Sequence, residues 1–148
     1  MKLLELVLSK KKQLSAILFI IWCCFIIRMT LLGRSMTTRR YEFNMFWAFQ
    51  ELMANHPEAY EDIGLYIKNV LLFIPFGFFL KSISYWNYKK VVVAGFITSL
   101  GIEITQYCFA IGLAEIDDLT GNTLGTALGC LMFMSIKTIR GRFKNGKT

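Results

Sequence analysis

The sequence has little of what soluble metal centres and hydrolytic sites are made of. Its one histidine, His56, stands beside Pro57 in the polar stretch ANHPEAYED, a setting that favours a loop residue over a metal ligand. Its four cysteines fall within apolar stretches and show no metal-ligand spacing, which indicates small buried residues. There is no P-loop, HExxH or GxSxG motif. The sequence therefore carries no recognised catalytic motif and leaves open whether the protein is an enzyme.

Charge is also scarce, and the apolar residues are not dispersed as they are in a soluble core. Charged residues make up 18% of the 148 residues, whereas hydrophobic residues make up 55% and gather in four blocks, at residues 13–33, 63–80, 91–111 and 119–136. A helix needs roughly 20 predominantly apolar residues to cross a bilayer. The pattern predicts an all-α fold, an integral membrane four-helix bundle in which residues 1–148 form a single domain. No small-x-small cleavage site follows the first block, so we expect it to remain as the first helix.

Basic and acidic residues separate between the two sides of this predicted bundle. If the N-terminus is cytoplasmic, most of the 17 basic residues fall on the cytoplasmic side and most of the 10 acidic residues on the other side. Because Lys and Arg near helix ends favour the cytoplasm, we expect both termini to be cytoplasmic. The basic stretch after residue 136 is interpreted as a topology signal that contacts anionic lipids, rather than as an arm that binds nucleic acid.

The longest connection between the predicted helices spans residues 34–68 and lies on the outer side. Its stretch YEFNMFWAFQELM carries Phe43, Phe46, Trp47 and Phe49. Aromatic rings concentrate at the membrane–water boundary because they tolerate both phases. We therefore expect an interfacial helix here, lying on the outer leaflet or dipping into it, and a poorly ordered loop is the alternative.

Proline and glycine mark two features of the predicted helices. Pro75, followed by Gly77, interrupts the second helix, and we expect a kink whose freed carbonyl is satisfied by neighbouring helices or water. Gly121, Gly125 and Gly129 repeat at four-residue spacing on the fourth helix. Such a flat stripe lets another backbone approach closely. It favours tight helix packing, and it also suits oligomerisation or a scaffold role in a larger membrane complex.

Three polar residues are expected at similar depth below the outer boundary. Glu103 and Gln106 are three residues apart and share a face of the third helix. At a rise of about 1.5 Å per residue, Gln106 and Arg28 both come out about 8 Å deep, and Glu103 about 12 Å deep. A charge at such depth costs on the order of 2.5–3.5 kcal/mol unless it is paired or hydrated. We therefore expect Arg28, on the first helix, to pair with Gln106 or Glu103.

Acidic residues cluster just before the fourth helix. Asp117 and Asp118 precede it, and Asn122 lies four residues after Asp118 on the same face. As separate structural groups, the aspartates would cap the helix in water, since carboxylates suit the unpaired N–H groups of a helix N-terminus. In the alternative interpretation, both aspartates, Glu115, Asn122 and Asn69 at the mouth of the second helix form one polar site that opens outward.

Carboxylates and carboxamides together can hold several kinds of ligand. They suit a divalent cation, with or without a bridged phosphate, and they equally suit a ligand that carries amines or hydroxyls. Neighbouring carboxylates can also share a proton. From the residues alone, the chemistry of this site and the identity of any cofactor therefore stay unassigned.

At NVLLFIPFGFFL and EITQYCFAIGLAEIDDLTGNTLG the sequence resembles the VanZ-like family of bacterial membrane proteins. The family pattern has N-x-x-x-F-x-P-x-G in the second helix, E-x-x-Q in the third, and D-x-D-D-x-x-x-N-T-x-G at the start of the fourth. By this resemblance the ligand-binding positions are Asn69, Glu103, Gln106, Glu115, Asp117, Asp118 and Asn122. The sequence departs from the pattern at Glu115, where the family has aspartate, and in the outer segment, where an Asn-Leu-x-Pro-Phe element lacks its proline.

The resemblance implies a role in resistance to teicoplanin-type lipoglycopeptides, which carry both a fatty chain and a polar peptide-sugar head. It brings no established reaction with it. The partners it implies are membrane lipids, together with a lipoglycopeptide or a lipid-linked cell-wall precursor. The alternative function is an enzyme or carrier that acts on polyprenyl phosphate or on a lipid-linked cell-wall precursor, which Glu103 with Gln106 at depth would favour.

Overall fold

Helices make up most of the computed structural model, which describes residues 2–32, 40–57 and 59–145. The α-helices of this part of the chain are α1 (Lys2–Ile27), α2 (Trp47–Met53), α3 (Ala59–Ile83), α4 (Tyr88–Phe109) and α5 (Ile116–Asn145). A π-helix, η1 (Arg28–Leu32), continues α1, and two short strands are β1 (Arg40–Glu42) and β2 (Leu113–Glu115). Four of the described helices, α3, α4, α5 and α1 with η1, are long and apolar enough to cross a membrane. The prediction of an all-α membrane bundle is confirmed, and only the last residue of the expected span 13–33 lies outside the described residues.

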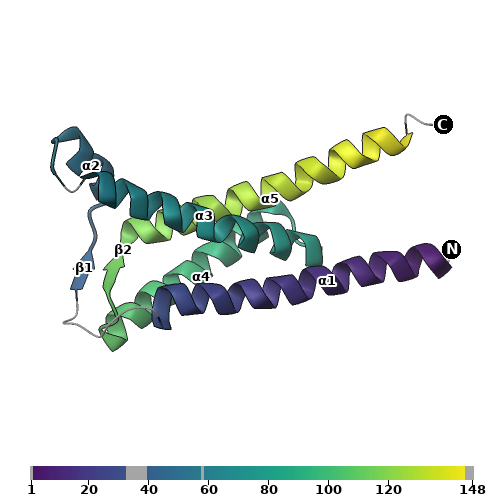
Figure 1. Cartoon of the computed structure of the whole chain (residues 1–148), viewed down its shortest axis with the longest axis horizontal. Helices are drawn as coiled ribbons and strands as arrows, with labels where there is room; N and C mark the ends of the chain where they lie inside the picture. Colours follow the sequence, from purple (N-terminus) through teal and green to yellow (C-terminus); the bar gives the residue numbers. More distant parts are fainter. Residues whose placement is uncertain (1, 33–39, 58, 146–148) are drawn as a thin grey trace.

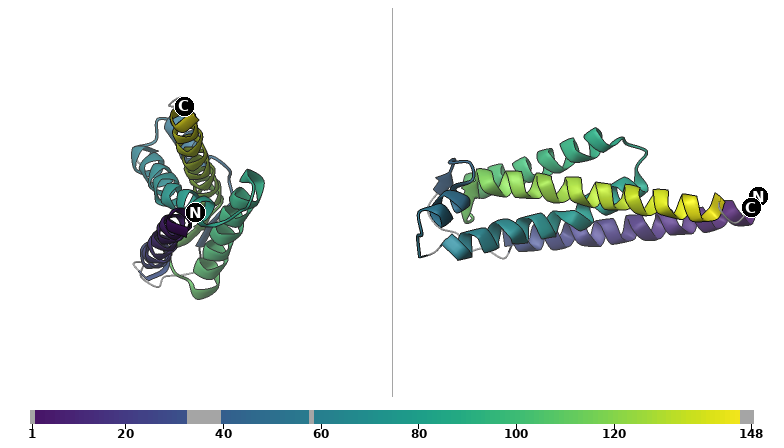
Figure 2. Two further views of the ribbon diagram at one scale, coloured as in Figure 1. Left: turned by 90° about the vertical axis from the view of Figure 1, so that its right-hand side faces the viewer. Right: turned by 90° about the horizontal axis from the view of Figure 1, so that it is seen from above.

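The four long helices run along one common direction and define two ends of the molecule (Figure 1). The start of α1 and the end of α5 lie at one end, and α2, β1 and β2 lie at the opposite end, as the further views also show (Figure 2). α5 has 30 residues. At about 1.5 Å per residue such a helix is longer than the hydrocarbon core, which is about 30 Å thick. Its last turns carry Lys137, Arg140 and Arg142 and are suited to water or lipid headgroups.

The most extensive helix contact joins α3 to α5 and follows the glycine stripe. A Cβ added at Gly125 would lie 2.2 Å from the carbonyl oxygen of Val70, and one at Gly129 would lie 1.9 Å from that of Ile74. A Cβ at Gly121, one turn nearer the start of α5, would lie 3.4 Å from the carbonyl oxygen of Tyr66, which is an ordinary contact distance. Small residues let helix backbones touch in this way. The stripe therefore packs against α3 of the same chain.

Thr126 marks the level at which three helices meet. A Cβ at Gly77 of α3 would lie 2.1 Å from the carbonyl oxygen of Thr126, and a Cβ at Gly95 of α4 would lie 2.3 Å from its hydroxyl oxygen. Thr126 is fully buried, and its hydroxyl donates to the carbonyl oxygen of Asn122 at 3.0 Å. Substituting either glycine would thus push α3 or α4 away from α5.

Pro75 lies inside α3, and the helix continues through it. Because proline has no N–H, the carbonyl four residues earlier, at Leu71, loses its helical partner. The indole of Trp22 on α1 donates to the adjacent carbonyl of Leu72 at 2.9 Å. α1 therefore donates to the carbonyl next to the one that Pro75 leaves without its helical partner. Apolar side chains close the core around this point: Phe19, Trp22, Ile26, Phe73, Phe76 and Ile102.

The outer segment differs from the expected single helix. Among residues 40–57, the described part that precedes α3, the helix is confined to Trp47–Met53, whereas β1 pairs in parallel with β2 in the register Tyr41 to Ala114. The sequence pattern predicts a short turn at residues 111–115. The chain turns at residues 110–112, where Ala110 and Gly112 have positive φ, but residues 113–115 form β2. Strand pairing between segments so far apart in the chain depends on tertiary contacts that no local pattern contains.

Replacing Gly129 by alanine is expected to destabilise the protein by about 1–3 kcal/mol, because the added methyl group must displace the backbone of α3. Thermal unfolding in detergent, followed by circular dichroism, measures the effect. Gly101→Ala on α4 is the control, since nothing lies within 4 Å of a Cβ there. Its unfolding midpoint is expected to equal or exceed that of the wild type. Equal midpoints for the two variants would contradict the packing described here.

Candidate functional site

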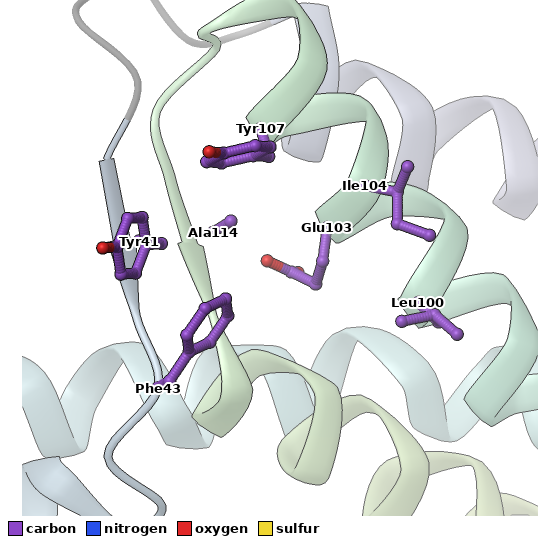
Figure 3. A pocket seen from close by; sticks show the side chains of 7 residues that line it. All are labelled: Tyr41, Phe43, Leu100, Glu103, Ile104, Tyr107 and Ala114. Atoms are coloured by element: carbon purple, nitrogen blue, oxygen red, sulfur yellow. The ribbon is translucent and has the colours of Figure 1, made fainter.

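A pocket of about 600 Å³ lies between α4 and the two strands (Figure 3), at the end of the bundle that carries α2. We call it the α4 pocket, and it is lined by Tyr41, Phe43, Leu100, Glu103, Ile104, Tyr107 and Ala114. Most of this lining is aliphatic or aromatic. Leu100, Ile104 and Tyr107 are exposed on the surface of α4. The pocket therefore opens sideways, toward the space that lipid fills around a membrane bundle.

The walls of the α4 pocket follow the side-chain periodicities of a helix and of a strand. On α4, residues three and four positions apart share one face and line the pocket: Leu100, Glu103, Ile104 and Tyr107. Tyr41 and Phe43 are two residues apart on extended backbone and so point to the same side. The Tyr41 ring stacks on Phe43, with centroids 4.9 Å apart, and meets Tyr107 edge-on at 6.2 Å. Aromatic contacts thus connect the β1 wall to the α4 wall.

Glu103 places a carboxyl group on the inner wall of this pocket. Its side chain is 8% exposed and points from α4 toward β2 (Figure 3). Its Oε2 accepts a hydrogen bond from the backbone N–H of Glu115 at 2.9 Å. Burial of a carboxylate is unfavourable unless hydrogen bonds replace its water. The contact with Glu115 both compensates Glu103 and fixes the end of β2 to α4.

The two aspartates at the start of α5 are buried and have different partners. The Asp117 carboxylate accepts from the backbone N–H of Phe46 at 2.5 Å and, more distantly, from that of Ala48 at 3.4 Å. Phe46 has φ of 59°, which is unfavourable for a bulky residue, and Asp117 helps to hold it there. Asp118 accepts from the side-chain amide of Asn69. The interpretation of the aspartates as caps in water is therefore wrong, because they tie α5 to α2 and α3.

A divalent cation was one of the ligands that the residues of the acidic turn would suit. Across residues 2–32, 40–57 and 59–145, no group of three or more His, Cys, Asp or Glu side chains is placed to hold a metal ion. Glu115 lies in β2 and meets Glu103 through its backbone N–H, while Asp117 faces α2. The described contacts of these acids are with protein groups of the outer segment and of the neighbouring helices.

Two carboxamides lie on the buried side of α4 and α5. The Gln106 side chain donates to the carbonyl oxygen of Thr30 at 2.9 Å, and the Asn122 side chain donates to the hydroxyl of Ser99 at 2.9 Å. Thr30 lies in the last turn of η1, where helix carbonyls lack internal partners. The carbonyl oxygens of Gln106 and Asn122 have no hydrogen-bond partner among the described residues. Each amide therefore joins two helices and keeps one acceptor unused.

Arg28 does not take part in these contacts. It begins η1, its side chain is exposed, and in the described part of the chain no hydrogen bond or ion pair joins it to Gln106 or Glu103. The expected pairing of Arg28 is therefore not found. The π-helix buries Thr30 in its place, and Gln106 binds the Thr30 carbonyl.

The structure thus brings together some predicted site residues and adds others. Asn69 meets Asp118, and Glu115 meets Glu103, but of the predicted ligand-binding residues only Glu103 lines the α4 pocket. The aromatic wall from β1 was missed, because β1 itself was not predicted. The α4 wall could have been predicted from the sequence, since Leu100, Ile104 and Tyr107 repeat at helical spacing around Glu103.

Asp117→Asn is expected to loosen α2 while the four long helices stay folded, because a hydrogen bond to a charged group contributes about 1.5–3 kcal/mol. Amide hydrogen exchange in residues 46–50 should accelerate by roughly 10- to 100-fold, which mass spectrometry in detergent measures. Glu51→Gln is the control, since the Glu51 carboxylate contacts His56 and not the start of α2. Unchanged exchange in Asp117→Asn would show that Asp117 does not hold the segment.

Comparisons with known proteins relate the chain to one family. The model of the VanZ/LLP1 family matches residues 15–138 of the chain. Over 75 residues the chain is 39% identical to Protein VanZ of Enterococcus faecium, a match that covers 45% of this chain and 42% of that protein. The chain therefore matches less than half the length of this relative. No solved structure matches the chain.

Proposed function

The chain belongs to the VanZ/LLP1 family of membrane proteins, and from that premise we propose that it lowers susceptibility to teicoplanin-type lipoglycopeptides by binding the drug through its fatty chain. The observation that carries the proposal is the α4 pocket, which is apolar, open sideways and bounded by the buried Glu103. A fatty chain could enter it from the outer leaflet without first leaving the apolar phase. The polar head of the drug would stay at the level of β1 and α2.

The physical basis of such binding is not the hydrophobic effect alone. A chain that moves from lipid into the pocket exchanges one apolar environment for another, so selectivity depends on packing and on polar contacts. The rings of Tyr41, Phe43 and Tyr107 provide rigid walls, and Glu103 adds a polar group at their base. A lipid-free glycopeptide has no chain to place there. We therefore expect the protein to distinguish the two classes of drug.

The proposal also needs the α4 pocket to lie in the outer leaflet, which holds if both termini are cytoplasmic. The end of the bundle where α1 starts and α5 finishes carries the basic residues Lys10, Lys11, Lys12, Arg140 and Arg142. The opposite end carries Asp117 and Asp118. This distribution supports the orientation that the excess of Lys and Arg on cytoplasmic segments favours.

Reporter fusions are expected to show this orientation. A fluorescent protein fused after residue 148 should fluoresce, and alkaline phosphatase inserted at residue 55, between α2 and α3, should be active, because it folds only outside the cytoplasm. The reversed pattern, with an active phosphatase at the C-terminus, would place the α4 pocket in the inner leaflet and contradict the proposal.

Expression in a glycopeptide-sensitive Gram-positive host is expected to protect against teicoplanin and not against vancomycin. Ile104→Trp, which fills the α4 pocket, should abolish the protection, as measured by the minimal inhibitory concentration at equal protein level. Ile97→Trp is the matched control, because Ile97 lies on the same helix outside this pocket and is 61% exposed, against 54% for Ile104. Equal protection against both drugs, or full protection by Ile104→Trp, would contradict the proposal.

The second candidate is an enzyme or carrier that acts on polyprenyl phosphate or a lipid-linked cell-wall precursor. It is favoured by the burial of Glu103, which is 8% exposed and lines an apolar pocket, and of Gln106, which is 1% exposed one turn further along α4. In the same assay, Glu103→Gln keeps an acceptor for the Glu115 N–H and removes the charge. Chemistry that uses the carboxylate predicts loss of protection in this variant, whereas binding of the drug by packing predicts that most of it remains.

A further inference from the structure

A groove of about 290 Å³ lies along the first turns of α4, at the opposite end of this helix from β1 and β2 (Figure 2). It is lined by Trp86, Lys90, Val93, Ala94 and Ile97, and we call it the Trp86 groove. Lys90, Ala94 and Ile97 follow the spacing of one helix face. At about 1.5 Å per residue, the groove therefore runs about 10 Å along α4, from a basic side chain to apolar ones nearer the middle of the bundle.

Hydrogen bonds fix the backbone at the mouth of the Trp86 groove. The ammonium group of Lys81, in the last turn of α3, donates to the carbonyl oxygen of Trp86. The side chain of Asn87 accepts from the backbone N–H of Lys90 at 2.9 Å and so caps α4. Both residues that flank the mouth are thus held in place before any ligand arrives, which lowers the entropy cost of binding.

Acidic residues are nearly absent from the segments that form this end of the bundle. Residues 63–102 and 119–148 contain no Asp or Glu, and residues 1–41 contain one, Glu5. Across the described part of the chain, no carboxylate lies within ion-pair distance of the Lys90 ammonium group. A counter-ion for Lys90 therefore has to come from outside these segments.

Two neighbouring lysines differ from Lys90 in having partners within the protein. Lys81 binds the carbonyl oxygen of Trp86, as described above, and the ammonium group of Lys12 lies 4.3 Å from the centre of the Tyr85 ring. The latter contact is a cation–π interaction that joins α1 to the connection between α3 and α4. Among the lysines around the connection, Lys90 is the one that lines the groove, and its ammonium group makes no hydrogen bond to a described residue.

A basic mouth beside an apolar floor selects among ligand classes. A soluble anion would use Lys90 but leave the apolar floor uncovered, and a neutral lipid would cover the floor but leave the ammonium group without a counter-ion. A zwitterionic lipid brings a phosphate together with its own cation, which competes with Lys90 for it. An anionic phospholipid satisfies both parts of the groove. Anionic headgroups are attracted to basic residues at the membrane surface, where tryptophan is also enriched.

We propose that the Trp86 groove binds one anionic phospholipid, with its phosphate at Lys90 and an acyl chain along Val93 and Ile97. In the orientation proposed above, this lipid belongs to the inner leaflet. The inference goes beyond the proposed function and does not depend on it, because the Trp86 groove and the α4 pocket share no lining residue. The protein would thus hold a lipid of defined charge at the end of the bundle opposite the α4 pocket.

Native mass spectrometry of the full chain in detergent tests this assignment. The probes are phosphatidylglycerol and phosphatidylcholine with identical acyl chains, and glycerol phosphate as a soluble head. The wild type is expected to hold phosphatidylglycerol at least about fivefold more tightly than phosphatidylcholine, as one lysine at the membrane surface allows. Excess glycerol phosphate should not displace the bound lipid.

Lys90→Gln is expected to lower the preference for phosphatidylglycerol by roughly fivefold. Lys89→Gln is the matched control, because it makes the same change of charge at the adjacent exposed position, which does not line the groove. Ile97→Trp fills the apolar part and should reduce the binding of phosphatidylglycerol while it keeps the protection against teicoplanin. Circular dichroism verifies that each variant is folded.

The possible failures of this inference differ from those of the proposed function. Equal retention of the two lipids by the wild type would overturn the anion site, and an equal loss in Lys89→Gln and Lys90→Gln would replace it by diffuse attraction to surface charge. Undiminished binding in Ile97→Trp would show that no chain occupies the groove. Displacement of the lipid by glycerol phosphate would overturn the lipid source in favour of a soluble phosphate. None of these results bears on drug binding in the α4 pocket, which Ile104→Trp tests.

Discussion

The direct contact between the backbones of α3 and α5 is the constraint on which the end of the molecule that carries α2, β1 and β2 depends. It requires glycine at Gly125 and Gly129, where any Cβ would overlap the carbonyl oxygens of α3. Because the helices touch there, Asn69 on α3 comes within hydrogen-bonding distance of Asp118 at the start of α5. The acidic turn is thereby brought under the outer segment, where Asp117 can bind the backbone at the start of α2. Without this contact, the start of α2 would lose its hydrogen bonds to Asp117.

Glu103, Asp117 and Asp118 attach β2 and the start of α2 to the helices of the bundle. Glu103 binds the backbone of β2, Asp117 binds the backbone that leads into α2, and Asp118 binds Asn69. Charge-assisted hydrogen bonds are stronger than neutral ones, particularly where water is scarce. Glu103 holds β2 against α4, and β2 pairs with β1, so that side chains from α4 and both strands complete the α4 pocket. Glu103 therefore serves both the fold and the proposed function, since loss of its contact with Glu115 would also displace the strand wall of the α4 pocket.

The membrane bundle could be predicted from the sequence, because long apolar blocks and the positions of Lys and Arg are local properties. Glu103 could likewise be selected, since a carboxylate inside an apolar helix needs a reason to be there. The pairing of β1 with β2 could not be predicted, because residues 40–42 and 113–115 are too short to carry a strand pattern and are far apart in the sequence. Arg28 was misplaced for a related reason. The expected depth assumed a regular α-helix, whereas residues 28–32 form a π-helix that exposes Arg28 and buries Thr30.

The central claim is that a fatty chain binds between α4 and β1. Photolabelling with a lipid that carries a diazirine in its acyl chain tests it most directly, with the labelled peptides identified by mass spectrometry in a bilayer nanodisc. The claim predicts that labels concentrate on residues 100–107 of α4 and on residues 41–43 of β1. Exposed apolar residues elsewhere, such as Ile17 and Ile20 on α1, should receive only background label. Labelling spread evenly over all exposed apolar surfaces would show that the pocket holds no chain and would contradict the claim.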